Sequence, residues 1–308
     1  MTVINTNISA TLTANALTKN ERAMGQTMER LSTGLRINSA ADDAAGLAIS
    51  SKMTSQINGL NQAARNSNDA ISMLQTADGA LIEVSNMLQR MRELAIQASS
   101  GTNTASDQFN LNTEFTSLKA GIESIVRNTQ WNGENILAGG ASGAAVAKNF
   151  QVGANATQTL QVTFADFNIA KGSTGSNISD AGPLAVLDID GAAGSGAAQD
   201  LNSLVIYHAT PANAVTEISM AVYGIDDAIG KINTERAKFG AAINSLEYTV
   251  DNLTNVSQNT AASRSRIQDA DYAAETTELA RTQIIQQAGT AMLSQANQQA
   301  QSVLALLK

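Results

Sequence analysis

The chain has 308 residues, a formal net charge of −8 and an isoelectric point near 4.7. Because no cluster of Lys and Arg interrupts this acidic balance, the composition argues against nucleic-acid binding and against attraction to an anionic membrane surface. The absence of cysteine excludes disulfides, thiolate metal sites and cysteine nucleophiles. No run of about 18 apolar residues predicts a membrane-spanning helix.

Aromatic residues make up 4% of the chain and charged residues 15%, against a typical charged share of about 25%. The apolar residues are mainly Ala, Ile, Leu, Val and Met, which favours slim, closely packed helices over a thick aromatic core. Uncharged polar residues replace much of the missing charge. Such surfaces can be covered by other protein without the cost of desolvating ions.

Residues 1 to about 35 are predicted to form an amphipathic helix. Its apolar positions are Ile4, Ile8, Leu12, Ala16, Met24, Met28, Leu31 and Leu35. The following segment, from about 32 to 43, is predicted to be a bend or loop. Asp42 and Asp43 stand where carboxylates favour the start of the next helix.

The next predicted helix extends to about Ser99 and carries a long stripe of small or apolar residues. Apart from Ser67, which occupies one slot, the stripe comprises Met53, Ile57, Leu60, Ala64, Ile71, Leu74, Ala77, Leu81, Val84, Leu88, Met91, Ala95 and Ala98. Steps that alternate between three and four residues, averaging about 3.5, keep one stripe facing a partner helix. A turn at 100–103 and a third stripe ending near Asn128 predict an antiparallel helical hairpin.

From 141 to 210 the helical spacing disappears, and short alternating runs such as 159–164 and 184–189 predict strands and loops. A fourth helical stripe is predicted over about 217–257, with Arg236 in one slot: Val222, Ile225, Ile229, Ile232, Phe239, Ile243, Leu246, Val250 and Leu253. A hinge is expected over 263–271, followed by a last amphipathic helix. Its apolar positions are Ile285, Ala288, Met292, Ala296, Val303 and Leu307.

The two long stripes most simply pair with each other, which folds the chain back on itself. The predicted fold is therefore mainly α: a long antiparallel helical coiled-coil bundle formed by both chain ends, with a small β and loop region in the middle of the sequence. The short end helices would be marginal alone, because helix nucleation is costly. We expect them to be mobile in the free chain and to order when further copies of the chain cover their apolar faces.

The candidates for catalytic chemistry are few and do not assemble into a site. The adjacent carboxylates Asp42–Asp43 and Asp226–Asp227 point about 100° apart if they lie on helices. Asp188 and Asp190 could converge on a strand but have no further acid or His beside them, and His208 is the single histidine. We predict no enzyme activity, no metal site and no cofactor.

Motifs at both ends of the chain resemble those of bacterial flagellin. The run LSTGLRINSAADDAAGLAIS at residues 31–50 is similar to the signature of that family. So are SRIQDADY at 265–272, QANQ at 295–298 and VLALL at 303–307. The resemblance covers roughly residues 1–140 and 210–308, in the expected order.

This resemblance implies a subunit of the extracellular flagellar filament, used for bacterial motility. Residues 1–43 and 266–308 would form the inner helical domain, residues 44–140 and 211–265 the outer helical bundle, and residues 141–210 a short variable region. Flagellin leaves the cell without a cleaved signal peptide, and the first residues here lack the basic and unbroken apolar regions of such a peptide. The resemblance also implies a secretion chaperone, a filament cap protein and hook–filament junction proteins as partners.

Two sets of site residues follow from this resemblance. The expected inner contacts of the homopolymer are Ile4, Ile8, Leu12, Ile285, Met292, Val303 and Leu307. The family motif for host Toll-like receptor 5 is similar to the segment 89–94, with a further contact on the next helix. The corresponding residues, which are also expected to meet the adjacent subunit, are Gln89, Arg90, Arg92, Glu93, Leu94 and Glu114.

Two alternatives stay open on the sequence. A hook–filament junction protein shares the terminal pattern but would be present in few copies. An intracellular helical-hairpin scaffold would be a cytosolic dimer and would not be secreted.

Overall fold

The computed structural model describes residues 7–139, 146–167, 204, 206 and 211–305, and of these 211–217 and 299–305 by their backbone alone. The predicted strand at 184–189 lies outside the described residues. The chain divides into two compact units, one formed by residues 1–58 with 256–308 and the other by residues 59–255.

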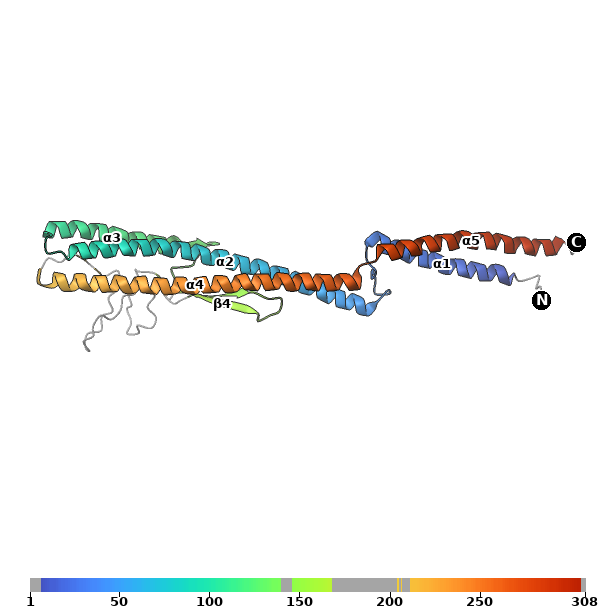
Figure 1. Ribbon diagram of the computed structural model, residues 1–308, viewed down its shortest axis with the longest axis horizontal. Helices are drawn as coiled ribbons and strands as arrows, with labels where there is room; N and C mark the ends of the chain where they lie inside the picture. The colour runs from blue at the N-terminus through green and yellow to red at the C-terminus, as the bar shows by residue number, and fades with distance from the viewer. Residues whose placement is uncertain (1–6, 140–145, 168–203, 205, 207–210, 306–308) are drawn as a thin grey trace. The chain divides into compact units, whose positions relative to one another are not determined.

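The predicted helices are confirmed, and the mainly helical fold class with them (Figure 1). Their bounds are α1 Ile8–Thr33, α2 Ala44–Ala98, α3 Ala105–Asn128, α4 Pro211–Gln268 and α5 Tyr272–Ala305.

The expected limits of α4 were wrong at both ends. The helix begins at Pro211, where the missing N–H and fixed φ of proline suit a first helical position. It then continues through most of the predicted hinge to Gln268, so the interruption before α5 is confined to 269–271. The segment 263–268 contains no Gly or Pro. The Ser263 hydroxyl donates to the Asn259 carbonyl one turn earlier, so this polar residue is accommodated within the helix.

The conformation of the loop between α1 and α2 is stabilised by a glycine and two aspartates, residue types typical of helix ends. Gly34 closes α1 in the left-handed region, at φ 73°, and its N–H donates to the Arg30 carbonyl. Asp42 accepts hydrogen bonds from the backbone and hydroxyl of Ser39, which lower the pKa of its carboxyl group. Asp43 accepts from the Gly46 N–H and so caps α2. Asp43 therefore has the expected role at this helix start, whereas Asp42 binds the loop that precedes the helix.

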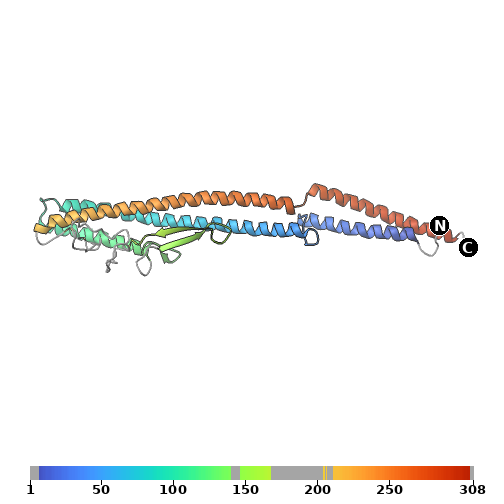
Figure 2. The ribbon, with the colours of Figure 1, turned by 90° about the horizontal axis from the view of Figure 1, so that it is seen from below.

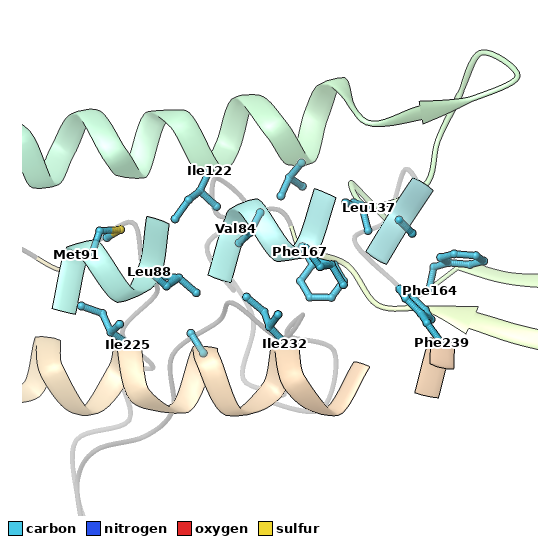
Figure 3. Packing of buried hydrophobic residues seen from close by; sticks show 14 of the residues in the cluster. Val84, Leu88, Met91, Ile122, Leu137, Phe164, Phe167, Ile225, Ile232 and Phe239 are labelled. Atoms are coloured by element: carbon cyan, nitrogen blue, oxygen red, sulfur yellow. The ribbon is translucent and has the colours of Figure 1, made fainter. Parts of the chain in front are cut away.

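In the second unit, α2 lies between α3 and α4 (Figure 3). Leu88 and Met91 of α2 are fully buried, together with Ile122 of α3 and with Ile225 and Ile232 of α4. The predicted stripe is confirmed, because every one of its members from Leu74 to Ala98 is buried.

The two polar residues in the stripes have specific partners. Ser67 is buried, and its hydroxyl donates to the Ala63 carbonyl, 2.9 Å away, so it can occupy an apolar slot. Arg236 of α4 donates from Nε to Asp78 Oδ1 of α2, 2.7 Å away, and forms an ion pair between the two helices.

The described part of this unit also contains two small hairpins. Strands β1 (Gln130–Trp131) and β2 (Glu134–Asn135) are joined by Asn132 and Gly133, both with positive φ as in a type I′ turn. Strand β3 (Val146–Gln151) pairs antiparallel with β4 (Thr159–Phe164), which confirms the strand predicted at 159–164. Phe164 is buried against Phe239 of α4, with ring centroids 5.3 Å apart.

In the first unit, α1 and α5 run antiparallel, side by side (Figures 1 and 2). The Asn7 amide donates to the Ala296 carbonyl near one end of the pair, and Arg30 forms a 3.2 Å ion pair with Glu275 near the other. Beyond Arg30, Leu35 and Asp269 form a short antiparallel bridge. The expected pairing of the two chain ends is confirmed.

The fully buried residues in the contact between α1 and α5 are polar, and half-buried apolar residues, among them Leu17, Met24 and Leu31, alternate with them along α1. The buried residues of α1 are Asn20 and Thr27, and Thr282 is buried on α5. The Asn20 amide, 8% exposed, donates to the Thr282 carbonyl at 2.8 Å and to Gln286 Oε1 at 3.2 Å. A buried polar residue in a helix pair selects one alignment, because any shift leaves it without partners. Asn20 therefore sets the register of α1 against α5.

Replacing Leu88 with alanine is expected to lower the free energy of unfolding by about 2–5 kcal/mol, because it opens a cavity in the buried cluster. Urea unfolding followed by the fluorescence of Trp131, which packs against that cluster, measures the effect. Ile96→Ala is the matched control on the same helix, since Ile96 is 50% exposed, and it should cost less than about 0.5 kcal/mol. Equal losses in the two variants would contradict the assigned core.

Replacing Asn20 with leucine is expected to strengthen the pairing of α1 with α5 while loosening its register. Because the chain has no cysteine, engineered pairs can report the alignment. Leu17→Cys with Gly289→Cys reports the observed register, since a Cβ on Gly289 would lie 3.0 Å from Leu17 Cδ2. Leu17→Cys with Ala296→Cys reports a slip of one heptad.

With Asn20 in place, the first pair should form a disulfide on oxidation and the second only a trace. With Asn20→Leu, the second pair should reach an amount comparable to the first. Unchanged yields in the Asn20→Leu background would show that other contacts set the register.

Candidate functional site

The helix pair α1–α5 exposes large apolar side chains, although the residues fully buried in its contact are polar. Leu12 of α1 is 71% exposed and Met292 of α5 is 64% exposed, whereas Thr27 and Thr282 are buried. The exposed side chains of this kind on the two helices are Ile8, Leu12, Met28, Ile284, Ile285 and Met292. This set is called here the apolar flanks. A helix covered on one face only normally carries polar residues on its other faces.

The apolar flanks lie on more than one side of the pair. Ile8 and Leu12 are four residues apart, and Ile285 and Met292 are seven apart, so each couple shares a helix face. Ile284 is adjacent to Ile285 and therefore points about 100° away from it. A single neighbouring molecule cannot cover faces that point in such different directions.

The structure describes four of the seven predicted inner contacts, and all four belong to the apolar flanks: Ile8, Leu12, Ile285 and Met292. Ile4 and Leu307 lie outside the described residues, as does the side chain of Val303. The sequence analysis missed Ile284, because it followed a single stripe per helix. A count of apolar residues on every face would have found it.

The second predicted surface lies on α2 and α3, where Arg90 is held by carboxylates of two helices. Its guanidinium donates from Nε and Nη2 to Glu114 Oε1 on α3, at 3.0 and 2.8 Å, and from Nη1 to Glu93 on α2 at 3.0 Å. Hydrogen bonds to Glu114 and Glu93 raise the pKa of Arg90. Gln89 is exposed beside these groups.

Arg92 completes this surface toward α4. Its Nε donates to Asp226 Oδ1 at 2.5 Å, and this hydrogen bond, with the charge of the same carboxylate, raises the pKa of Arg92. Asp226 was not predicted to belong to the surface. Its neighbour Asp227 instead pairs with Lys231, 2.9 Å away, so the two adjacent carboxylates do not converge on one site. We call the exposed residues of this surface the charged patch: Gln89, Arg90, Arg92, Glu93, Glu114 and Asp226.

Leu94 does not belong to the charged patch. Its side chain is 1% exposed and packs in the core of the second unit. The expectation that it contributes to an exposed surface is therefore wrong in this fold. The spacing in the sequence predicts that Leu94 is buried. It follows Met91 by three residues and precedes Ala98 by four, so it lies on the same helix face as the buried stripe.

The described residues offer little to catalytic or metal chemistry. Within them, no group of three or more His, Cys, Asp or Glu could hold a metal ion. His208, Asp188 and Asp190 lie outside that part of the chain. No helix of the described ranges is both long and apolar enough to cross a membrane.

Comparison with known proteins identifies the family. Residues 4–142 match the bacterial flagellin N-terminal helical region, and residues 222–307 match the bacterial flagellin C-terminal helical region. The chain is 41% identical over 314 aligned residues to flagellin of Bacillus subtilis, which covers 99% of both proteins. It is 42% identical to flagellin of Xenorhabdus nematophila, again over 99% of both.

A solved structure of a putative flagellar hook-associated protein from Vibrio parahaemolyticus is similar in fold. It superimposes with a TM-score of 0.58 over 74% of this chain and 100% of that one, at 17% sequence identity. Identity this low shows the fold alone. The relatives that match over the full length are flagellins. This similarity favours a flagellin over the two alternative hypotheses, a hook–filament junction protein and an intracellular scaffold.

Bacterial flagellins are structural, non-enzymatic subunits that polymerise into the extracellular flagellar filament for motility. The chain belongs to this family, as the matches at both of its ends, the full-length identity and the paired terminal helices show together.

Proposed function

We propose that α1 and α5 make the inner contacts of the filament through Ile8, Leu12, Ile285 and Met292. Ile4, Val303 and Leu307 continue this set toward the chain ends. One observation carries the proposal: the apolar flanks are exposed on a pair whose fully buried residues, Asn20, Thr27 and Thr282, are polar. Neighbouring copies of the chain are the cover that a filament subunit has available.

The energy of this contact is large for a slim helix pair. Fully burying a Leu, Ile or Met side chain contributes roughly 1.5–3 kcal/mol, and the apolar flanks carry several such side chains on different faces. Coverage from several sides suits heterologous contacts that repeat along a helix and do not close into a ring. The end helices are mobile in the free subunit under this proposal and become ordered when neighbours cover them.

The proposed layers of the filament follow the breaks between helices. Residues 1–43 and 266–308 belong to the inner helical domain, residues 44–140 and 211–265 to the outer helical bundle, and residues 141–210 to a short variable region. The breaks that support this division are the loop after α1 and the short interruption before α5.

The charged patch is the proposed site for host Toll-like receptor 5 and for the adjacent subunit of the filament. Support comes from its exposure and from the bridging of α2 to α3 and α4 by Arg90 and Arg92. Exposed ion pairs contribute little to stability, so these side chains can exchange their partners for those of a bound protein. One surface with both uses would make the loose subunit, rather than the polymer, the form that the receptor binds.

The remaining partners follow from family membership. A secretion chaperone that binds the C-terminal leucines, the filament cap protein and the hook–filament junction proteins complete the proposed set. Export proceeds without a cleaved signal peptide.

The double variant Ile8→Gln with Leu12→Gln is expected to fold like the wild type but to polymerise poorly. Each substitution removes apolar burial of about 1.5–3 kcal/mol, so the critical concentration for seeded assembly should rise at least about 100-fold. Sedimentation and electron microscopy after addition of short filament seeds measure it. Tyr248→Gln is the control, since Tyr248 is 76% exposed on α4 of the second unit, and it should assemble almost normally. Normal assembly by the double variant would reject the proposed contact.

Exchanging the charges of Arg90 and Glu114 separates recognition from folding. Arg90→Glu with Glu114→Arg keeps an ion pair between α2 and α3 but inverts the charges presented to a partner. Activation of cells that carry Toll-like receptor 5 should require at least about tenfold more protein. The matched control exchanges Glu123 and Arg127, an ion pair of 2.7 Å within α3, and should leave activation unchanged. Equal activation by both exchanges would place the receptor contact elsewhere.

A further inference from the structure

The described methionines differ sharply in exposure. Met28 is 55% exposed and Met292 is 64% exposed, whereas Met73 and Met91 are buried. The other described methionines are half-buried: Met24, Met53, Met87 and Met220. Within the described part of the chain, the two most exposed methionine residues therefore lie on α1 and α5.

Both exposed methionines belong to the apolar flanks. Met292 shares a helix face with Ile285, seven residues earlier. Met28 lies on α1, next in sequence to the buried Thr27. Under the proposed function these side chains become covered by neighbouring subunits, so their environment differs between the free subunit and the filament.

We propose that Met28 and Met292 form an oxidation switch for polymerisation, in which a hydroperoxide converts their thioethers to sulfoxides in the free subunit and thereby prevents assembly. This inference rests on the proposed inner contacts. The sulfur lone pair attacks the terminal peroxide oxygen, an S–O bond forms and the O–O bond breaks. The proton on the transferred oxygen passes to the departing oxygen, so the thioether is oxidised by two electrons to a sulfoxide and hydrogen peroxide is reduced to water.

The consequence for assembly follows from the polarity of the product. A thioether is a flexible apolar group, whereas a sulfoxide is a polar hydrogen-bond acceptor that must lose water when it is buried. Under the proposed function the side chains that replace this water are the apolar flanks of neighbouring subunits, which carry no hydrogen-bond donor. Oxidised subunits are therefore excluded from the polymer, and methionine sulfoxide reductases can restore them.

The same geometry makes the reaction depend on the state of assembly. In the filament both sulfur atoms are covered, so peroxide should oxidise them much more slowly than in the free subunit. Met73 and Met91, buried within one chain, should react slowly in both states and provide an internal reference.

The test treats full-length free subunit with hydrogen peroxide, removes the oxidant and maps sulfoxide at each methionine by mass spectrometry. Seeded polymerisation is then compared among three proteins: wild type, Met28→Leu with Met292→Leu, and Met87→Leu with Met220→Leu. Leucine keeps volume and apolar character. The last variant is the matched control, because it removes two half-buried methionines and keeps both proposed sites.

We expect peroxide to oxidise Met28 and Met292 first in the wild type and to raise its critical concentration at least about tenfold. The Met87→Leu with Met220→Leu variant should lose assembly to the same degree. The critical concentration of the Met28→Leu with Met292→Leu variant, compared with that of its own untreated sample, should not rise after the same treatment. Filaments of the wild type should take up at least about fivefold less sulfoxide at the two sites than free subunits do.

A wild-type subunit that carries sulfoxide at both sites and still assembles normally would overturn the inference. So would an equal loss of assembly in the Met28→Leu with Met292→Leu variant, because the damage would then lie elsewhere. Failure of the proposed function gives a different result, since untreated Ile8→Gln with Leu12→Gln protein would then polymerise like the wild type.

Discussion

The structure depends on where each helix can bury its apolar residues. In the second unit α2 has a helix on either side, so its stripe from Leu74 to Ala98 is removed from water within one chain. In the first unit α1 has α5 as its paired helix, and one partner covers one face. The same kind of amphipathic sequence therefore gives a closed core in one unit and an open surface in the other.

Polar groups give the open pair its specificity. Leucine at position 20 would pair more strongly but would allow other alignments. The amide of Asn20, bonded to the Thr282 carbonyl, gives one alignment a clear advantage. The apolar flanks are exposed on the pair and are available to neighbouring subunits under the proposed function. Polar residues then fix the pairing within the chain, and apolar residues serve the contacts between subunits. This arrangement suits a subunit that stays unassembled until it reaches a growing filament.

Exposed methionines and exposed ion pairs each have properties that suit more than one purpose. Exposed methionines adapt to irregular neighbours, but they bring chemical sensitivity, since their sulfur atoms react when they are not covered. In the charged patch, Arg90 and Arg92 link helices within the subunit through exposed ion pairs. Such ion pairs are weak, so the side chains can exchange these partners for groups of a bound protein. Under the proposed function, folding, assembly and recognition use the same side chains in different states of the molecule.

The sequence by itself determined the helices, the buried stripes and the pairing of the chain ends, because a spacing near 3.5 residues specifies a helix with one face toward a partner. It also placed Ile8, Leu12, Ile285 and Met292 among the apolar residues available for assembly, and its motifs pointed to the family. It even held the position of Leu94, whose spacing from Met91 places it in the core. Only the tertiary structure decided that Arg92 meets Asp226, that Arg236 meets Asp78, and that Asn20 and Thr282 are buried together between α1 and α5. Pairs of residues so distant in the sequence produce no periodic pattern from which they could be predicted. An apolar stripe also does not indicate whether its own chain or a neighbouring molecule covers it.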